Sequence, residues 1–471
     1  MAELTEESAL KAKTLLLYSA MVAAAVGVFL WIRSAGESLT APMRVRLGQF
    51  APNAPTTSVT SFTHVLLALV VIILCARGLG SVLLRFGQPQ VIGEMIAGIL
   101  LGPSLLGQLA PGTFHYLFPR EMAPYLSAIA NIGVILYMFL VGVELDTSLL
   151  RERTHASVAT SHASIVAPFL LGSAIALWLY PIYSTSDVPF VVFALFMGIS
   201  MSVTAFPVLA RVISDRGMQE NSLGATALAC AAVDDVTAWC LFALVVSVAR
   251  SQAQKSLVTL ALTGGFILAV LLVVRPGAVW LARRHRVEQQ NGQSSIVVAC
   301  MALLLAALTT QWIGIHALFG AFLVGAVIPR DSQLAKDIKQ KFEDLVVILF
   351  VPIFFAFTGL RTQIGLLNGI GDWAICLAII VVASLGKFGG GTIAARLTGL
   401  PWHEAASLGI LMNTRGLMEL IVLNVGLDLG VLTSKLFAML VIMAIVTTMA
   451  TTPVLQMIAR GSPAVAAGQK A

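Results

Sequence analysis

The sequence has little charge. Only 11% of its 471 residues are Asp, Glu, Lys or Arg, whereas a soluble globular domain carries about a quarter. Hydrophobic residues make up 58% of the chain. This balance excludes a soluble enzyme and predicts an all-α protein that lies mostly within the bilayer. We therefore expect no enzymatic activity.

Cysteine is also scarce. All five cysteines lie within apolar runs, and no two have the spacing of a metal site or a redox motif. We interpret them as small core residues and expect no cofactor. The net charge of +6 comes from basic residues scattered over short loops, so nucleic acid is not an expected partner.

Long apolar runs, in contrast, are abundant. Runs of about 20 residues are the signal of a membrane-spanning helix. We identify fourteen: 13–33, 62–84, 89–107, 124–145, 156–181, 188–211, 221–249, 257–282, 293–311, 314–329, 345–360, 372–397, 404–426 and 433–458. The charged amphipathic stretch at 333–344 is expected to form an interfacial helix.

The basic residues of the loops predict the orientation. One alternating set of loops holds fifteen Lys and Arg and the other set holds five. The richer set is expected to be cytoplasmic, which places both termini inside a cell inner (plasma) membrane. The loop after the first run breaks this rule, with Arg33, Arg44 and Arg46 outside.

The first run is expected to be a retained helix and not a cleaved signal peptide, because the residues before it are acidic. We divide the chain into an N-terminal helix with an external linker (1–61), a transporter domain (62–458) and a short cytoplasmic tail (459–471).

The transporter domain has an internal symmetry. With 257–282 taken as a linker helix, six runs precede it (62–249) and six follow it (293–458), so the second half is inverted. The fifth run of each half is broken, by MSVTAFPVLAR at 201–211 and MNTRGLMEL at 412–420. Paired broken helices at matching positions indicate the binding site of a secondary transporter. Pro207 is expected to free backbone carbonyls there.

Two adjacent acids, Asp234 and Asp235, lie in the middle of the run 221–249. A charge at the centre of a membrane helix costs about 2.5–3.5 kcal/mol on the insertion scale, so such residues are usually functional. The two side chains point about 100° apart and cannot do the same work. A structural ion pair would explain one of them but hardly both.

Other charges within the runs have candidate partners. Lys387 needs a buried carboxylate, and the aspartate pair supplies one, as a switchable partner or as a permanent bridge. Arg415 and Glu419 are four residues apart on the second broken helix, which favours a structural pair. Glu144 ends its run and either pairs with Arg415 or lies at the interface.

Five blocks of sequence resemble the second family of monovalent cation:proton antiporters, with the plant cation/proton exchangers especially similar. They are PQVIGEMIAGILLGPSLLG (89–107), FLVGVELD (139–146), SVTAFPVLARVI (202–213), AAVDDVTAW (231–239) and MNTRGLMELIVLNVG (412–426). The resemblance implies thirteen helices in inverted repeats, two broken helices that cross, and a homodimer. The first run is an extra helix relative to that pattern.

The resemblance also assigns residues. Asp235 matches the aspartate that binds the cation and the proton, and Lys387 matches the core lysine. Asp234 matches a variable position at which plant exchangers usually have Asn. Thr204–Pro207 and Asn413–Gly416 match the breaks in the crossing helices.

These observations predict a transporter that exchanges Na⁺ or K⁺ for protons. The transported cation is expected at Asp235, with the hydroxyl of Thr204 in its shell because hard cations prefer oxygen. Two alternatives have different mechanisms: a channel-like potassium efflux pathway, and a sodium-coupled organic-anion symporter of similar architecture.

Overall fold

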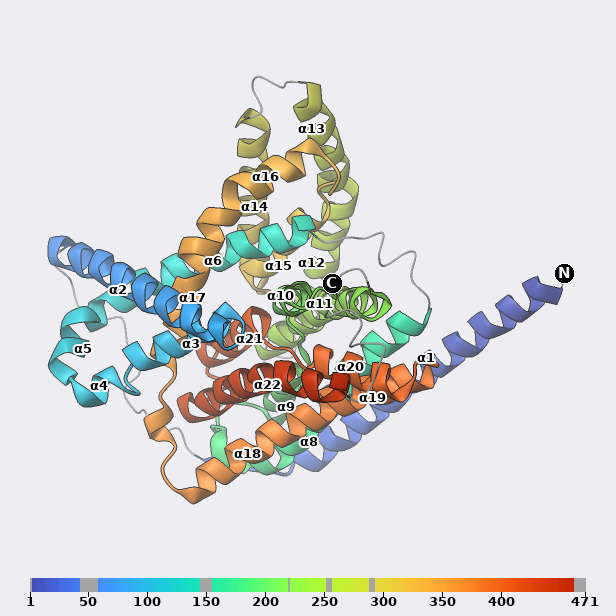
Figure 1. The fold of residues 1–471 in the computed structure, drawn as a ribbon, viewed down its shortest axis with the longest axis horizontal. Helices are drawn as coiled ribbons and strands as arrows, with labels where there is room; N and C mark the ends of the chain where they lie inside the picture. The colour runs from blue at the N-terminus through green and yellow to red at the C-terminus, as the bar shows by residue number, and fades with distance from the viewer. Residues whose placement is uncertain are drawn as a thin grey trace.

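The computed structural model of the chain describes residues 2–42, 58–144, 155–218, 221–250, 256–287 and 293–460. Within these residues all regular structure is helical (Figure 1). The predicted linker arginines Arg44 and Arg46 and most of the predicted tail lie outside the described residues.

The first half of the chain contains ten α-helices and a single 3₁₀ turn among the described residues. Their bounds are α1 (Ala2–Gly36), α2 (Ser58–Arg85), α3 (Gln90–Leu101), α4 (Leu106–Leu109), α5 (Pro111–Leu117), η1 (Arg120–Met122), α6 (Ala123–Glu144), α8 (His155–Tyr183), α9 (Phe190–Ser202), α10 (Phe206–Asp215) and α11 (Ser222–Arg250).

The linker and the second half contain three π-helical turns, each inside a longer helix. The linker is α12 (Ser256–Ala269), η2 (Val270–Val274) and α13 (Arg275–Val287). The second half is α14 (Gln293–Ile313), α15 (Ala317–Ala326), α16 (Gln333–Leu345), η3 (Val346–Phe350), α17 (Val351–Arg361), η4 (Ile364–Leu366), α18 (Ile370–Ser384), η5 (Leu385–Gly389), α19 (Gly390–Leu397), α20 (Trp402–Met412), α21 (Leu417–Asp428) and α22 (Ser434–Arg460).

Each of the fourteen predicted runs corresponds to a helix or a helix pair. Eleven helices of the described part are long and apolar enough to span a membrane, and α20–α21 forms one span bent by 43°. The runs 188–211 and 314–329 contain shorter apolar helices, α9 and α15. The amphipathic stretch at 333–344 is helical, but α16 continues through η3 into α17 without a break.

Two helix crossings hold one group of helices together. α3 packs against α17, and α6 packs against α15. At these crossings Gly98 faces Gly359, and Gly142 faces Gly325. A Cβ added to any of the four would lie 2.2–2.5 Å from a backbone atom of the facing helix, so only glycine permits this approach. In each crossing the second helix of one half meets the third helix of the other half.

A second group surrounds the two broken helices, near the centre of Figure 1. α8 packs against α9, α11 and α19, and α20 packs against α19 and α22. Helix α1 packs on α8 and α9, and its N-terminal end projects away from the other helices (Figure 1). The predicted N-terminal run is therefore one helix attached to the outside of the second group.

Candidate functional site

The two broken helices meet at their breaks. Helix α9 ends at Ser202 and α10 begins at Phe206, while α20 ends at Met412 and α21 begins at Leu417. The N–H of Ala205 donates to the carbonyl of Thr414 at 3.0 Å, which joins one break to the other. Two positive and two negative helix ends therefore meet at one buried place.

Pro207 is the second residue of α10. A proline in the first helical turn loses no hydrogen bond, because that N–H has no intrahelical partner. Pro207 therefore costs α10 no hydrogen bond. It lies at the start of a separate half-helix, at the break that the sequence predicted, and its part in freeing carbonyls stays a prediction.

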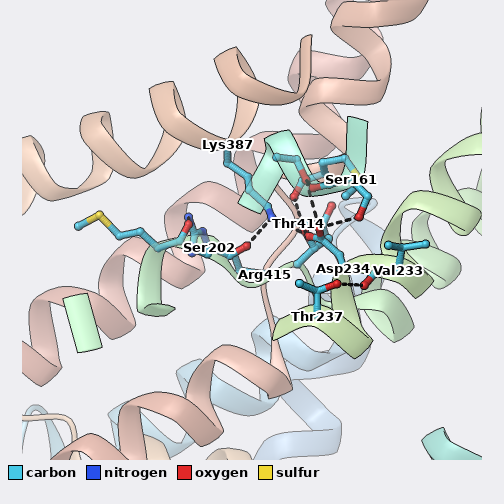
Figure 2. A network of polar contacts seen from close by, with 12 residues as sticks. Ser161, Ser202, Val233, Asp234, Thr237, Lys387, Thr414 and Arg415 are labelled. Atoms are coloured by element: carbon cyan, nitrogen blue, oxygen red, sulfur yellow. Dashed lines mark hydrogen bonds and ion pairs between the residues drawn. The ribbon is translucent and has the colours of Figure 1, made fainter. Parts of the chain in front are cut away.

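Asp234 is fully buried and receives polar groups on both carboxylate oxygens (Figure 2). The hydroxyls of Ser161 and Ser164, from α8, both lie 3.2 Å from Oδ1. The hydroxyl of Thr204 donates to Oδ2 at 2.5 Å, and the ammonium of Lys387 lies 2.7 Å from the same atom. Such a satisfied carboxylate has no oxygen left over for another ligand.

Lys387 is the third residue of the π-helical turn η5 and is completely buried. π-Turns inside α-helices are frequent at functional sites. In Figure 2 its side chain reaches from that helix to Asp234 and to the carbonyl of Ser202, to which it donates a hydrogen bond. Lys387 thus neutralises Asp234 and also the negative end of α9.

Arg415 binds the same helix end. Its Nη1 donates to the carbonyl of Ser200 at 3.0 Å and its Nη2 to that of Met201 at 2.9 Å. The structure also places its Nη1 3.1 Å from Glu419, with both side chains fully buried. Together with Lys387, it gives each of the last three carbonyls of α9 a cationic donor.

Asp235 lies in a different environment from its neighbour. It is 2% exposed and accepts a hydrogen bond from the backbone N–H of Phe206, at the positive end of α10. Its Oδ1 has no hydrogen-bond partner among the described residues. Asp235 also lines a cavity of about 310 Å³. Of the two aspartates, this is the one that can accept a proton or a cation from the cavity.

The cavity extends from Asp235 to the ends of α6 and α16. It is bordered by the acidic side chains of Glu94, Glu144 and Glu343 and by the ring of Tyr137. Glu144 pairs with Lys339 at 2.7 Å. The structure therefore supports the expectation that Glu144 lies at the membrane interface, and not the alternative that it pairs with Arg415. Glu94 accepts a hydrogen bond from Gln90 at 3.0 Å.

Two predicted residues differ from expectation in their surroundings. The Thr204 hydroxyl was expected beside a cation at Asp235, but it lies against Asp234 and is 3.0 Å from the carbonyl of Met412. Asn413 follows the last residue of α20, and its buried Oδ1 has no partner among the described residues. Both residues line the crossing, but neither contacts Asp235 in a hydrogen bond found in the described part of the chain.

Ser161 and Ser164 were missed by sequence reasoning. They are three residues apart in the apolar run 156–181, so they share a helix face. The clustering of hydroxyl residues in the first part of this run, at Ser157, Thr160, Ser161 and Ser164, was the signal that could have identified them.

Comparison with known proteins identifies the family. Residues 57–461 match the family described as sodium/hydrogen exchanger, transmembrane. The chain belongs to this family. The exchanger is 43% identical to the Na⁺/H⁺ antiporter NhaS4 of Synechocystis over 392 residues, which cover 83% of this chain and 95% of that one.

Eukaryotic relatives are longer. The exchanger is 38% identical to cation/H⁺ antiporter 20 of Arabidopsis thaliana, with 85% of this chain and 49% of that one covered. It is 35% identical to K⁺/H⁺ antiporter 1 of Saccharomyces cerevisiae, with 79% and 43% covered. The chain thus spans about half the length of these two relatives.

A solved structure supports the fold. The sodium proton antiporter MjNhaP1 of Methanocaldococcus jannaschii superposes with a TM-score of 0.58 at 17% identity, covering 84% of the exchanger and 95% of that chain. The predicted family and the predicted antiporter fold are both confirmed.

Proposed function

We propose that the exchanger moves Na⁺ or K⁺ across the membrane in exchange for protons, by alternating access to Asp235. The observation that carries this proposal is the division of the aspartate pair. Asp234 is saturated by four polar side chains, whereas Asp235 lines the cavity and its Oδ1 has no hydrogen-bond partner among the described residues. The named activities of the bacterial and yeast relatives support the same conclusion.

Competition at one carboxylate couples the two fluxes. Asp235 can hold a proton or a cation, and either ligand neutralises its charge. The neutral site is then able to move past the apolar walls of the cavity, because desolvating a charge is the main cost of that movement. Carbonyl oxygens of the open backbone at the crossing complete the cation shell, because the Thr204 hydroxyl is already bound to Asp234. The bacterial and yeast relatives named above are Na⁺/H⁺ and K⁺/H⁺ antiporters, so neither the channel nor the organic-anion symporter is favoured.

The cavity gives Asp235 a route of access from one end of the helices. The cavity reaches Asp235 from the ends of α6 and α16, which the basic residues predict to be cytoplasmic. At the other end of α17, Arg361 donates to Asn424 at 3.0 Å and pairs with Asp428 at 2.5 Å, both on α21. We assign the helices crossing at the four glycines to a scaffold and the helices around the breaks to the moving core. In the outward-facing state the Arg361 contacts must break.

We also propose a membrane location, an orientation and an oligomeric state for the chain. We assign the chain to the inner (plasma) membrane with both termini in the cytoplasm, on the strength of fifteen against five basic residues in the loops. We also propose a homodimer, which the family resemblance implies, and no enzymatic activity.

The test of this function is exchange by the purified protein in liposomes. Na⁺, K⁺, Li⁺ and Rb⁺ are added in turn over a range of pH, and proton movement is followed with a pH-sensitive dye. Because one carboxylate binds one proton or one cation, lowering the pH by one unit should raise the apparent KM for the cation about tenfold once Asp235 is mostly protonated. Cation flux without proton flux would support a channel, and a requirement for an organic anion would support a symporter.

Transport should also respond to membrane potential. Lys387 pairs with Asp234, the neighbour of Asp235 in the chain, so a cation bound at Asp235 repels its ammonium group. If the Asp234–Lys387 pair also gives up a proton, two protons move against one cation. Moving the resulting net charge across 100 mV changes the driving force by about 2.3 kcal/mol. The measurement is the exchange rate under potentials of both signs, with Asp234→Asn as the electroneutral control. A wild-type rate that ignores the potential would exclude this stoichiometry.

A further inference from the structure

A recess outside the ion site lies on α13, the second part of the linker helix. It has a volume of about 430 Å³ and is lined by Arg275, Pro276, Val279, Trp280 and Arg283. Residues 275, 279 and 283 are successively four apart, so they lie on one face of the helix. The recess therefore combines two guanidinium groups with an indole and an apolar floor.

This face of the linker points away from the protein. Trp280 is 58% exposed, and Leu272 and Val273, just before the recess, are 66% and 69% exposed. The opposite face of α13 is buried, and there His285 hydrogen-bonds Asp337 of α16 at 2.8 Å. In a membrane, the exposed apolar residues contact lipid chains.

The spacing of residues along the linker helix favours a place for the recess near the lipid headgroups. The apolar part of the linker runs from Ser256 to Val274. Its 19 residues span about 28 Å at 1.5 Å per residue, close to the ~30 Å of the hydrocarbon layer. Arg275 then follows where the hydrocarbon ends, and Trp280 lies where tryptophan is enriched in membrane proteins.

The two arginines of the recess have no anionic partner in the described part of the chain. No carboxylate there forms an ion pair with Arg275 or Arg283. Asp337, on the buried side of α13, is engaged by His285 and by Gln333 at 2.7 Å. Arg284 stacks over Trp280 at 5.5 Å, which adds a third positive charge at the edge of the recess. At the edge of the hydrocarbon layer these guanidinium groups are therefore available to an anionic lipid headgroup.

We propose that this recess binds the phosphate of an anionic phospholipid in the predicted cytoplasmic leaflet. The guanidinium of Arg is suited to phosphate because it presents paired donors in one plane. Basic pockets on the cytoplasmic side of membrane helices bind such headgroups. The exposed Leu272 and Val273 lie three and two residues before Arg275 and provide an apolar surface for an acyl chain, which a free phosphate ion would not use. This inference does not depend on the proposed ion exchange.

The test is lipid binding by the purified full-length protein in detergent. Native mass spectrometry counts bound phosphatidylglycerol, and thermal unfolding is followed with added phosphatidylglycerol or with phosphatidylcholine of the same chains. Only phosphatidylglycerol should bind stoichiometrically and raise the Tm. Each of Arg275→Gln and Arg283→Gln should weaken its binding about fivefold, and the double variant more.

Arg396→Gln is the matched control, because Arg396 also stacks on a tryptophan, Trp402, at 5.5 Å but lies on α19 outside the recess. It should bind phosphatidylglycerol as the wild type does. Equal binding by the double variant, or an equal effect of phosphatidylcholine, would overturn the proposal. Inorganic phosphate and glycerol phosphate form a separate arm: if either raises the Tm as much as the lipid, the recess is a site for soluble phosphate instead. The single variants keep the test valid if the double variant does not fold.

Discussion

Replacing Asp235 with asparagine is expected to abolish cation/proton exchange. Asparagine has nearly the same shape, but it can neither take up a proton nor neutralise a bound cation. Removing a positioned proton carrier typically costs 10²–10⁴-fold in rate, so a loss of at least about 100-fold is expected. The measurement is proton release driven by Na⁺ or K⁺ in liposomes that contain equal amounts of each protein.

The fold should survive this change. Asp235 has one carboxylate oxygen without a partner, so an uncharged side chain relieves a buried charge instead of breaking a pair. Asp344→Asn is the control, since Asp344 is exposed near the end of α16, and it should exchange at the wild-type rate. If an Asp235→Asn protein still coupled cation flux to proton flux, the assignment of Asp235 as the ion site would be wrong.

The second large effect concerns stability. Replacing Lys387 with methionine keeps the bulk of the side chain but leaves the buried carboxylate of Asp234 without its countercharge. Breaking a buried ion pair in this way costs about 3–5 kcal/mol in the free energy of unfolding. Adding Asp234→Asn to the same chain removes the unpaired charge, so the double variant should recover much of that loss. Unfolding in detergent, measured for the two single variants and the double variant, gives the coupling between the two residues.

Lys435→Met is the matched control for this cycle. Lys435 also pairs with an aspartate, Asp372, at 2.6 Å, but its side chain is 33% exposed. A pair so close to solvent contributes about 0–1 kcal/mol, so the same substitution should cost little there. Additive effects of Lys387→Met and Asp234→Asn would show that the pair is not a coupled unit.

The sequence predicts the helices well for a physical reason. A membrane helix must be apolar over the thickness of the bilayer, so a local run of apolar residues is enough to locate it in the sequence. Buried charges are conspicuous in the same way, which is why Asp234, Asp235, Lys387, Arg415 and Glu419 could all be singled out. Their roles in transport remain predictions.

What the sequence does not reveal are contacts between distant parts of the chain. Arg415 reaches the carbonyls of Ser200 and Met201, more than 200 residues away, and no local pattern encodes a backbone partner. The 100° between neighbours on a helix predicts that Asp234 and Asp235 differ, but only the packing of α8 and α10 shows which one faces the cavity. The junction of α16 with α17 was missed because a charged stretch beside an apolar one looks like two elements.

The four glycines at the scaffold crossings have a consequence for how this protein can evolve. At Gly98, Gly142, Gly325 and Gly359 the backbones themselves form the contact, so no side chain can be exchanged for another of similar size. No substitution at these positions is expected to be neutral. A compensating change elsewhere cannot make room for a methyl group within 2.2–2.5 Å of a backbone atom of the facing helix. Divergence among exchangers of this shape should therefore accumulate in the lipid-facing surfaces before it reaches these crossings.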